Sequence, residues 1–232
     1  MNNKNVALYA SGAKAGHLEV ALESDAPYLV LCLEDGTPEN KKGEARHLVK
    51  QAIMNYSCNN KICCVRINGS DTEHWEKDIE VLFTEGKIPD RVRIPMAKSV
   101  LDIQKTVNKI EALQNLQGKK YLEIMVENKS CFEELSNILT IFSEKIAAIT
   151  VGGEDLLESV GRPEEALEIR KEIIRSCKEH SVPCLETTYM DYRNFPGLIA
   201  DTHYAMQLGF SGRSVVHPAH VKICEEIINS YV

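Results

Sequence analysis

Several features that mark common protein classes are missing from this chain of 232 residues. No apolar run approaches the ~20 residues of a membrane span, and the start, MNNKNVALYASG, has too short an apolar stretch for a signal peptide. Basic residues are in the minority, with 27 Lys+Arg against 34 Asp+Glu, and the formal net charge of −7 repels phosphate backbones and anionic lipid. We therefore expect no leader peptide, no membrane and no nucleic acid as partner.

Zinc-ligand spacing is also absent, because none of the eight cysteines forms a C-x-x-C pair. Cys32, Cys63 and Cys64 fall within apolar runs, where a reduced thiol behaves as a small hydrophobic side chain. This distribution indicates a reducing compartment, and the cytoplasm fits best. No G-x-G-x-x-G follows the first apolar run, and ASGAKAG at 10–16 is too loose a match to indicate dinucleotide binding.

The chain does contain a regular alternation of two kinds of segment. Short β-branched or aliphatic runs predict buried strands, and longer segments with helical spacing lie between them. The clearest predicted helices are 99–116, 163–180 and 218–231. The predicted strands are 6–10, 28–33, 61–67, 91–94, 121–126 and 146–151, with weaker ones at 183–188 and 214–217.

Eight strand and helix pairs in 232 residues give 232/8 = 29 residues per unit, the size of a βα repeat. A doubly wound open sheet uses the same local units. However, the dinucleotide fingerprint of that fold is missing, and no linker rich in Pro or Ser divides the chain. We predict an α/β protein with one domain, residues 1–232, folded as a single (β/α)8 TIM barrel.

Charged and amide side chains stand where the predicted strands end, and a βα barrel builds its active site from these ends and the loops that follow. We expect these side chains to converge on one rim. They are Glu34 and Asp35 after the second strand, Arg66 and Asn68 at the third, Glu127 and Asn128 after the fifth, Glu154 and Asp155 after the sixth, Glu186 and Asp191 by the seventh, and His217 at the eighth.

Each of these residues also has an ordinary structural interpretation. Asp155, which follows two turn glycines, is by itself more typical of a helix cap than of a site. Glu34 and Asp35 can cap the next helix, and His217 can mark a helix start. Arg66 can be half of a rim ion pair, which contributes little to stability. It is the joint placement of the set that favours function.

Carboxylates gathered on one rim repel each other unless a cation or a proton lies between them. Glu127 and Asp155, at the ends of neighbouring strands, each offer an oxygen to a hard cation, and Mg²⁺ suits two carboxylates, waters and substrate oxygens. The glycines at 152 and 153 have no Cβ and let a ligand approach closely. Arg66 carries the planar fork that pairs with a carboxylate. The predicted ligand is a small organic acid held between Mg²⁺ and Arg66.

Five stretches, in order along the chain, resemble motifs of the HpcH/HpaI aldolase and citrate lyase superfamily. The similarity is to the branch of citrate lyase beta subunits and malyl-CoA or citramalyl-CoA lyases. LEDGTPENKKGEAR at 33–46 is similar to L-E-D-A-V-x-P-x-x-K-x-x-A-R and retains Lys42 and Arg46. The others are CVRING at 64–69 (V-R-V-N), IMVENKSCF at 124–132 (I-E-T-x-x-G-V), ITVGGEDLLESVG at 149–161 (F-G-x-E-D-L-x-x-x-L-G) and GFSGRSVVHPAHV at 209–221 (G-F-x-G-K-x-x-I-H-P-x-Q-V).

The resemblance implies a (β/α)8 barrel, a homo-oligomer such as a trimer or hexamer, that makes or breaks a carbon–carbon bond with Mg²⁺. The family's substrates are 3-hydroxy acyl thioesters that bear a carboxylate. They give an acyl thioester and an oxo acid such as glyoxylate, pyruvate or oxaloacetate. The expected site residues are Glu127 and Asp155 for the metal, Arg66, Gly152, Gly153 and Asn68 for the substrate, and Arg66, Glu34 and Asp35 for catalysis.

The chain departs from the family pattern at two strand ends. Ser11-Gly12-Ala13 stand where the family has P-G-D, and PMAK at 95–98 replaces P-K-V-E. Contacts to coenzyme A or an acyl carrier are therefore expected to differ. Related lyases continue into a C-terminal lid that carries an acidic catalytic group, and we expect this lid to be absent because the sequence stops at Val232.

The leading hypothesis is a Mg²⁺-dependent carbon–carbon lyase that cleaves a 3-hydroxy-carboxyacyl thioester, or a related hydroxy acid, to an oxo acid and an acyl fragment. One alternative is an aldolase for free 4-hydroxy-2-oxo acids. Its D-T-E-H-G motif is replaced here by LEDG at 33–36, which argues against it. The other is a barrel that binds an oxo acid or thioester without turnover, within a complex. The altered fourth strand favours it, and the set of Arg66, Glu127 and Asp155 opposes it.

Overall fold

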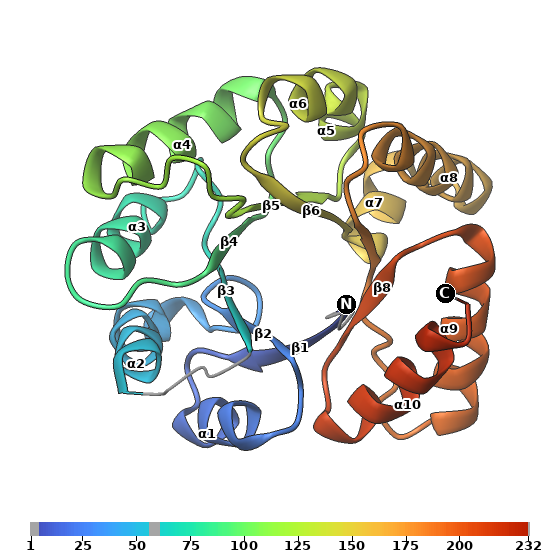
Figure 1. The fold of residues 1–232 in the computed structure, drawn as a ribbon, viewed down its shortest axis with the longest axis horizontal. Coiled ribbons are helices and arrows are strands. Elements are labelled where there is room, and N and C mark those ends of the chain that lie inside the picture. The colour runs from blue at the N-terminus through green and yellow to red at the C-terminus, as the bar shows by residue number, and fades with distance from the viewer. Residues whose placement is uncertain (1–4, 56–60, 232) are drawn as a thin grey trace.

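A closed ring of eight parallel strands forms the centre of the computed structural model, which describes residues 5–55 and 61–231. Figure 1 shows this ring with the helices around its outside. The predicted single (β/α)8 barrel is confirmed. The strands are β1 (Val6–Ser11), β2 (Tyr28–Cys32), β3 (Ile62–Arg66), β4 (Arg91–Ile94), β5 (Leu122–Val126), β6 (Ile146–Val151), β7 (Cys184–Glu186) and β8 (Gly212–Val215).

Each strand pairs with its neighbours in chain order, and β1 closes the ring against β8 through the register Leu8↔Val215. Helices cover the outer face and side chains fill the inner one, so strands such as β2 and β6 are buried along their whole length. The predicted boundaries of the first six strands hold to within one residue. The seventh is shorter than predicted, and the eighth begins two residues earlier.

The connecting helices start and stop at residues suited to those positions. Ser99 caps α4 through its side chain, and Pro163 occupies the first turn of α8. Gly161 and Gly209 end α7 and α9 with φ of 73° and 104°, which favours glycine. The helices are α1 (Ala15–Glu23), α2 (Lys42–Asn55), α3 (Trp75–Phe83), α4 (Val100–Leu113), α5 (Lys129–Glu133), α6 (Leu135–Ile141), α7 (Gly153–Val160), α8 (Pro163–Glu179), α9 (Phe195–Leu208) and α10 (Pro218–Asn229), with a 3-10 turn η1 (Glu39–Lys41) before α2.

The inside of the barrel holds a buried ion pair as well as aliphatic side chains. Arg93 and Glu123 both have side chains that are 0% exposed, and Arg93 Nη2 lies 2.9 Å from Glu123 Oε2. Arg93 Nη1 also donates to Tyr9 Oη at 2.6 Å. Burying two charges is costly unless each is paired and hydrogen-bonded. This network meets that requirement and gives the floor beneath the barrel mouth a fixed arrangement.

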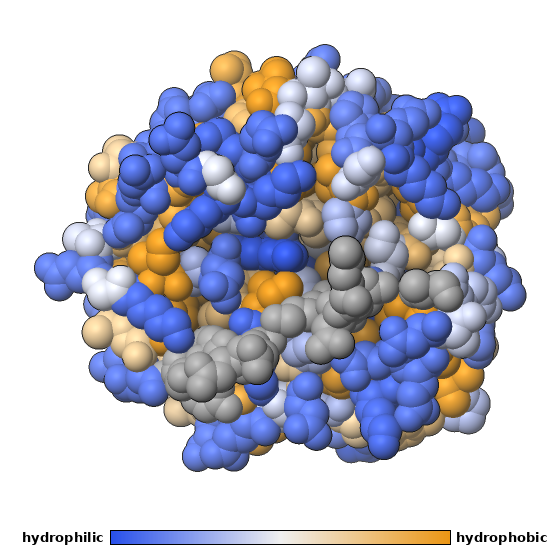
Figure 2. Space-filling model, viewed as in Figure 1, coloured by the Kyte–Doolittle hydropathy of each residue, from blue (hydrophilic) through white to orange (hydrophobic). Residues whose placement is uncertain are grey.

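The outer surface is mainly polar. Figure 2 shows hydrophilic side chains over most of one face of the ring, with apolar side chains visible between them in small areas. Among the helices in the described ranges, none combines the length and apolar character that a membrane crossing requires.

Candidate active site

A cavity of about 400 Å³ opens at the barrel mouth, where the strands end. Loops after β2, β6 and β7 and the helix after β1 form its walls, which is the position expected for the active site of this fold. The cavity brings together Asp35, Arg66, Gly152, Gly153 and Asp155 from the predicted set. Three strands distant in sequence thus contribute to one site.

Arg66, at the end of β3, is almost enclosed and contacts three carboxylates through one nitrogen. Its Nη2 lies 2.5 Å from Glu34 Oε2, 3.1 Å from Asp35 Oδ2 and 3.7 Å from Glu127 Oε2. The β2–β3 register sets Cys32 opposite Arg66, which brings the acids after β2 beside it. Arg66 Nε is buried and has no hydrogen-bond partner in the part of the chain that the structure describes. The guanidinium therefore neutralises part of the acidic rim while some of its donors remain unused by the protein.

Glu127 is the most deeply buried of these three acids. Its side chain is 0% exposed, and Oε1 accepts a hydrogen bond from the backbone N–H of Met96. Met96 has a φ of 54°, an uncommon value for a residue with a side chain, and such strain is found at functional positions. Oε2 accepts no hydrogen bond from the described residues, and its charged neighbour Arg66 Nη2 lies 3.7 Å away. Burial raises the pKa of Glu127 to about 7, although Arg66 and the Met96 N–H oppose the shift.

Gly152 faces the unpartnered oxygen of Glu127. A Cβ at position 152 would lie 2.5 Å from Glu127 Cβ and 2.8 Å from Oε2. The φ of Gly152 is −91°, so the backbone would accept other residues and only the space beside Glu127 requires glycine. An open, buried carboxylate oxygen beside a missing Cβ is an arrangement suited to a cation.

Asp155 lies in the first turn of α7 and is not its N-cap. Gly152 holds the cap position, and no side chain caps this helix. Burial raises the pKa of Asp155, and the neighbouring charge of Asp35 raises it further. Glu154 lines the same cavity. The cap interpretation of Asp155 is therefore not supported, and its carboxylate remains available at the mouth.

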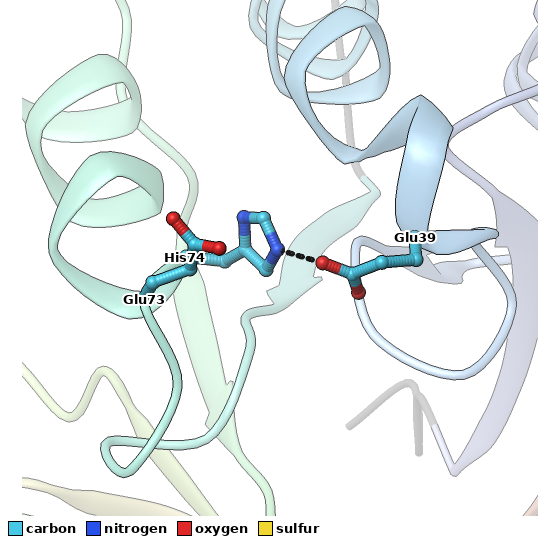
Figure 3. Close-up of side chains that lie close together, drawn as sticks. All are labelled: Glu39, Glu73 and His74. Carbon is cyan, nitrogen blue, oxygen red and sulfur yellow. Dashed lines mark hydrogen bonds and ion pairs between the residues drawn. The ribbon is translucent and has the colours of Figure 1, made fainter.

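The tightest group of candidate metal-binding side chains in the described ranges lies elsewhere. Glu39, Glu73 and His74 have ligand atoms within 4.8 Å of one another, at η1 and just before α3 (Figure 3). His74 Nε2 lies 2.5 Å from Glu39 Oε1, and this hydrogen bond lowers the pKa of Glu39. Both carboxylates are exposed. A surface hydrogen bond between His74 and Glu39 accounts for their contact, whereas the fit of Mg²⁺ at the mouth depends on Glu127 Oε2.

Asn68 does not lie on the cavity wall. Its Oδ1 accepts from Lys42 Nζ at 2.6 Å, and its Nδ2 donates to Asp78 Oδ2 at 2.6 Å. Both ends of the amide are thus engaged by protein groups, and the expected substrate contact has no support in this arrangement. Lys42 Nζ also donates to the carbonyl oxygens of Leu33 and Glu34. The lysine of the 33–46 motif therefore holds the turn that carries Glu34 and Asp35.

Several other rim residues have structural tasks. Asn128 caps α5 by accepting from the Cys131 N–H at 2.9 Å. His217 caps α10, as its ordinary interpretation predicted, by accepting from the Ala219 N–H. Glu186 pairs with Arg170. Glu34 and Asp35 cap no helix, since η1 begins without a side-chain cap, and they contact Arg66 instead.

Sequence reasoning missed several residues that line the cavity. Tyr9 and His17 come from β1 and α1, and Thr187, Thr188 and Met190 come from the loop after β7. Thr187 directly follows β7 and was open to prediction from the strand pattern, whereas Tyr9 lies within β1. His17 lies in the first turn of α1, and no local signal distinguishes it from an exposed surface histidine.

Comparison with known proteins agrees with this architecture. The family described as HpcH/HpaI aldolase/citrate lyase matches residues 5–218. The mitochondrial citramalyl-CoA lyase of Rattus norvegicus is 28% identical over 85% of this chain and 63% of its own length. The citrate lyase subunit beta of Escherichia coli (strain K12) is 28% identical over 95% of this chain and 75% of its own. The chain thus spans 63% and 75% of the lengths of these two curated relatives, less than two thirds of the first.

Solved structures show the same fold. A citrate lyase beta subunit from M. tuberculosis, described as complexed with oxaloacetate and magnesium, superposes with a TM-score of 0.80 at 20% identity. The match covers 98% of this chain and 99% of that one. This chain belongs to the HpcH/HpaI aldolase/citrate lyase family and is similar to its citrate lyase beta subunits.

Proposed function

We propose that the barrel mouth binds the hydroxy-acid head of its substrate and that the protein is a Mg²⁺-dependent carbon–carbon lyase. Its substrate is a 3-hydroxy-carboxyacyl thioester or a related hydroxy acid, split into an oxo acid and an acyl fragment. The observation that carries this proposal is the buried, unpartnered Oε2 of Glu127, which faces Gly152 and lies 3.7 Å from Arg66. Curated relatives named as citramalyl-CoA lyase and citrate lyase subunit beta support it.

The residues at the mouth fit a magnesium ion. Glu127 lies next to the cavity residues Gly152 and Arg66, and its Oε2 accepts no hydrogen bond within the described residues, while Asp155 offers a second carboxylate on the cavity wall. Hard oxygen donors with room for waters and substrate are what Mg²⁺ prefers. We propose Glu127 and Asp155 as its protein ligands. When bound, Mg²⁺ acidifies a coordinated hydroxyl and stabilises negative charge on the oxygen of the carbonyl that forms.

Arg66 is proposed to bind the carboxylate of the substrate head. It lines the cavity, and its three carboxylate contacts all use Nη2. Glu34 and Asp35 hold the guanidinium in place, so we assign them to positioning Arg66 within the catalytic site. A fixed guanidinium aligns the head so that the bond to be broken keeps one orientation. The backbone around Gly152 and Gly153 forms the wall that this head would contact.

The two halves of the proposal are testable together. The wild-type protein is incubated with Mg²⁺ and malyl, citramalyl and citryl thioesters and the corresponding free acids, and the released oxo acid is measured. Asp155→Asn should abolish Mg²⁺ binding measured by calorimetry while the circular dichroism spectrum stays unchanged. Arg66→Ala should weaken pyruvate or glyoxylate binding by about tenfold or more, since a charge-assisted pair contributes about 1.5 to 3 kcal/mol. Oxo-acid binding without cleavage of any substrate would favour the non-catalytic, complex-dependent role.

Two further proposals concern the assembly of the protein and its location. We propose a homo-oligomer, a trimer or hexamer, and light scattering on the purified protein tests it. We propose the cytoplasm as its location because six cysteines of the described residues are free and buried, which fits a reducing compartment: Cys32, Cys64, Cys131, Cys177, Cys184 and Cys224. Cys58 lies outside the described residues.

A further inference from the structure

The proposed cleavage requires a proton donor that none of the assigned residues supplies. When the carbon–carbon bond breaks, its electron pair stays on the acyl fragment as an enolate. That carbon must then take up a proton from a general acid within reach. The inference below rests on the proposed function, and it concerns which side chain of the mouth holds that proton.

The order of the strands in the closed barrel determines the direction in which the acyl fragment extends. Glu127 follows β5 and Asp155 is in the first turn after β6, so the metal-binding side of the mouth is at β5 and β6. In a ring ordered β1 to β8, β1 is four strands from β5 in either direction and stands directly across the mouth. A substrate whose head is held at β5 and β6 therefore extends its other half toward β1 and the helix that follows it.

His17 projects from that opposite wall. It lies in α1, which is anchored by buried Leu18, and it lines the same cavity as Arg66 and Asp155. No hydrogen bond or ion pair joins its imidazole to another residue of the described ranges, and its backbone N–H is held by Lys14 O at 2.9 Å. His17 also borders a second cavity of about 230 Å³, beside His217 and Pro218. The imidazole of His17 therefore lies between the cavity at the mouth and the second cavity, from which water can return a proton to it.

Three other groups at the mouth that can exchange protons, Tyr9, Cys32 and Asp35, are less suited to this role. Tyr9 Oη accepts a hydrogen bond from Arg93, and burial raises the pKa of Tyr9. Burial likewise raises the pKa of the Cys32 thiol. Asp35 is paired with Arg66. Histidine is the side-chain type that gives and regains protons near neutral pH. The charged and titratable groups that share the two cavities with His17 are Tyr9, Cys32, Asp35, Arg66, Glu154, Asp155 and His217.

We propose that His17 is the general acid that protonates the departing acyl enolate. In the cleavage direction the substrate hydroxyl loses its proton to solvent water, and the oxygen electrons form the carbonyl of the oxo acid. The carbon–carbon electron pair passes to the acyl fragment, whose carbon takes the proton from the His17 imidazolium. The neutral imidazole regains a proton from solvent, so no net proton is consumed. In the reverse direction the same imidazole removes a proton from the acyl carbon.

His17→Gln is the test variant, and His47→Gln is its control because His47 is exposed on α2 and lines neither cavity. Three quantities are measured with Mg²⁺ present. They are the cleavage rate across pH, the deuterium taken from D₂O into the acetyl group of acetyl-CoA with oxalate filling the head site, and the dissociation constant of pyruvate. His17→Gln should slow cleavage and exchange by about 100-fold or more, remove one limb of the pH profile and leave pyruvate affinity within twofold.

The outcomes separate this inference from the proposed function. If His17→Gln retains wild-type exchange, His17 is not the acid, whatever the cleavage rates are. If the wild type exchanges deuterium but cleaves no hydroxy acid, and the variant loses the exchange, the lyase proposal fails and the role of His17 stands. If the wild type neither cleaves nor exchanges, both fail. A decline in pyruvate affinity that matches the decline in rate would reduce His17 to a structural role and overturn the inference.

Discussion

Replacing Gly152 with alanine tests the packing beside Glu127. The added Cβ would lie 2.5 Å from Glu127 Cβ, whereas ordinary contact begins near 3.4 Å, so the shortfall is 3.4 − 2.5 = 0.9 Å. Glu127 directly follows β5 and its Cβ is attached to the backbone, so the overlap cannot be relieved by rotating a side-chain tip. Overpacking of this kind costs about 1 to 3 kcal/mol, and the lower chain entropy of alanine returns only about 0.4 to 1 kcal/mol.

We therefore expect Gly152→Ala to lower the free energy of unfolding by about 1 to 2 kcal/mol and to weaken Mg²⁺ binding at least tenfold, because Glu127 Oε2 must move. Gly43→Ala is the matched control, since nothing lies within 4 Å of a Cβ there and the residue is inside α2. That variant should be neutral or more stable. Urea unfolding and calorimetry measure the two effects. Stability and Mg²⁺ affinity in Gly152→Ala equal to those of Gly43→Ala would refute the reasoning.

Two further predictions concern buried carboxyl groups. The pKa of Glu127 is raised to about 7 from 4.5, so the folded chain holds a proton that the unfolded chain releases, and this group's contribution to stability is lost as pH rises from about 4.5 to 7. Without Mg²⁺, the loss should reach about 3 kcal/mol at most, and Glu127→Gln should flatten the profile of unfolding free energy against pH. Asp78→Ala should lower the free energy of unfolding in urea by about 3 to 5 kcal/mol, because it leaves the buried Arg46 and the Asn68 N–H without their carboxylate partner. The exposed pair of Lys41 and Glu44 provides the comparison, and Glu44→Ala should cost less than 1 kcal/mol; equal costs would contradict the assignment.

The strand positions were predictable where the apolar pattern was continuous. The run 146–151 matches β6 at both ends because charge or glycine bounds it. The eighth strand was misplaced by two residues because Arg213 lies in it fully buried. Its charge is satisfied by Asp201 at 2.9 Å and by Thr202, partners that no local pattern reveals. A charged residue in a sequence is ordinarily read as exposed, and only the fold shows the exception.

The position of the candidate site was predictable from the sequence, whereas the contacts between its side chains were not. Strand ends placed Arg66, Glu127 and Asp155 on one cavity or beside it, because parallel strands end at the same edge. Which acids face Arg66 depends on the register between β2 and β3, and a sequence does not state it. The same uncertainty explains why Asn68 was wrongly expected at the cavity. Asn68 follows the end of β3, and its side chain is hydrogen-bonded to Lys42 and Asp78 instead.

The pairing of β1 with β8 has a consequence for how the chain is made. Asn5 O accepts from the Arg213 N–H, and the register of the two strands runs from Val6↔Arg213 to Leu8↔Val215. During synthesis, one edge of β1 has no partner until residues 212–215 have left the ribosome. An unpaired strand edge is a template for association with other chains. The nascent protein therefore exposes this edge while the residues between β1 and β8 are synthesised, and a chaperone that shields it would act on β1.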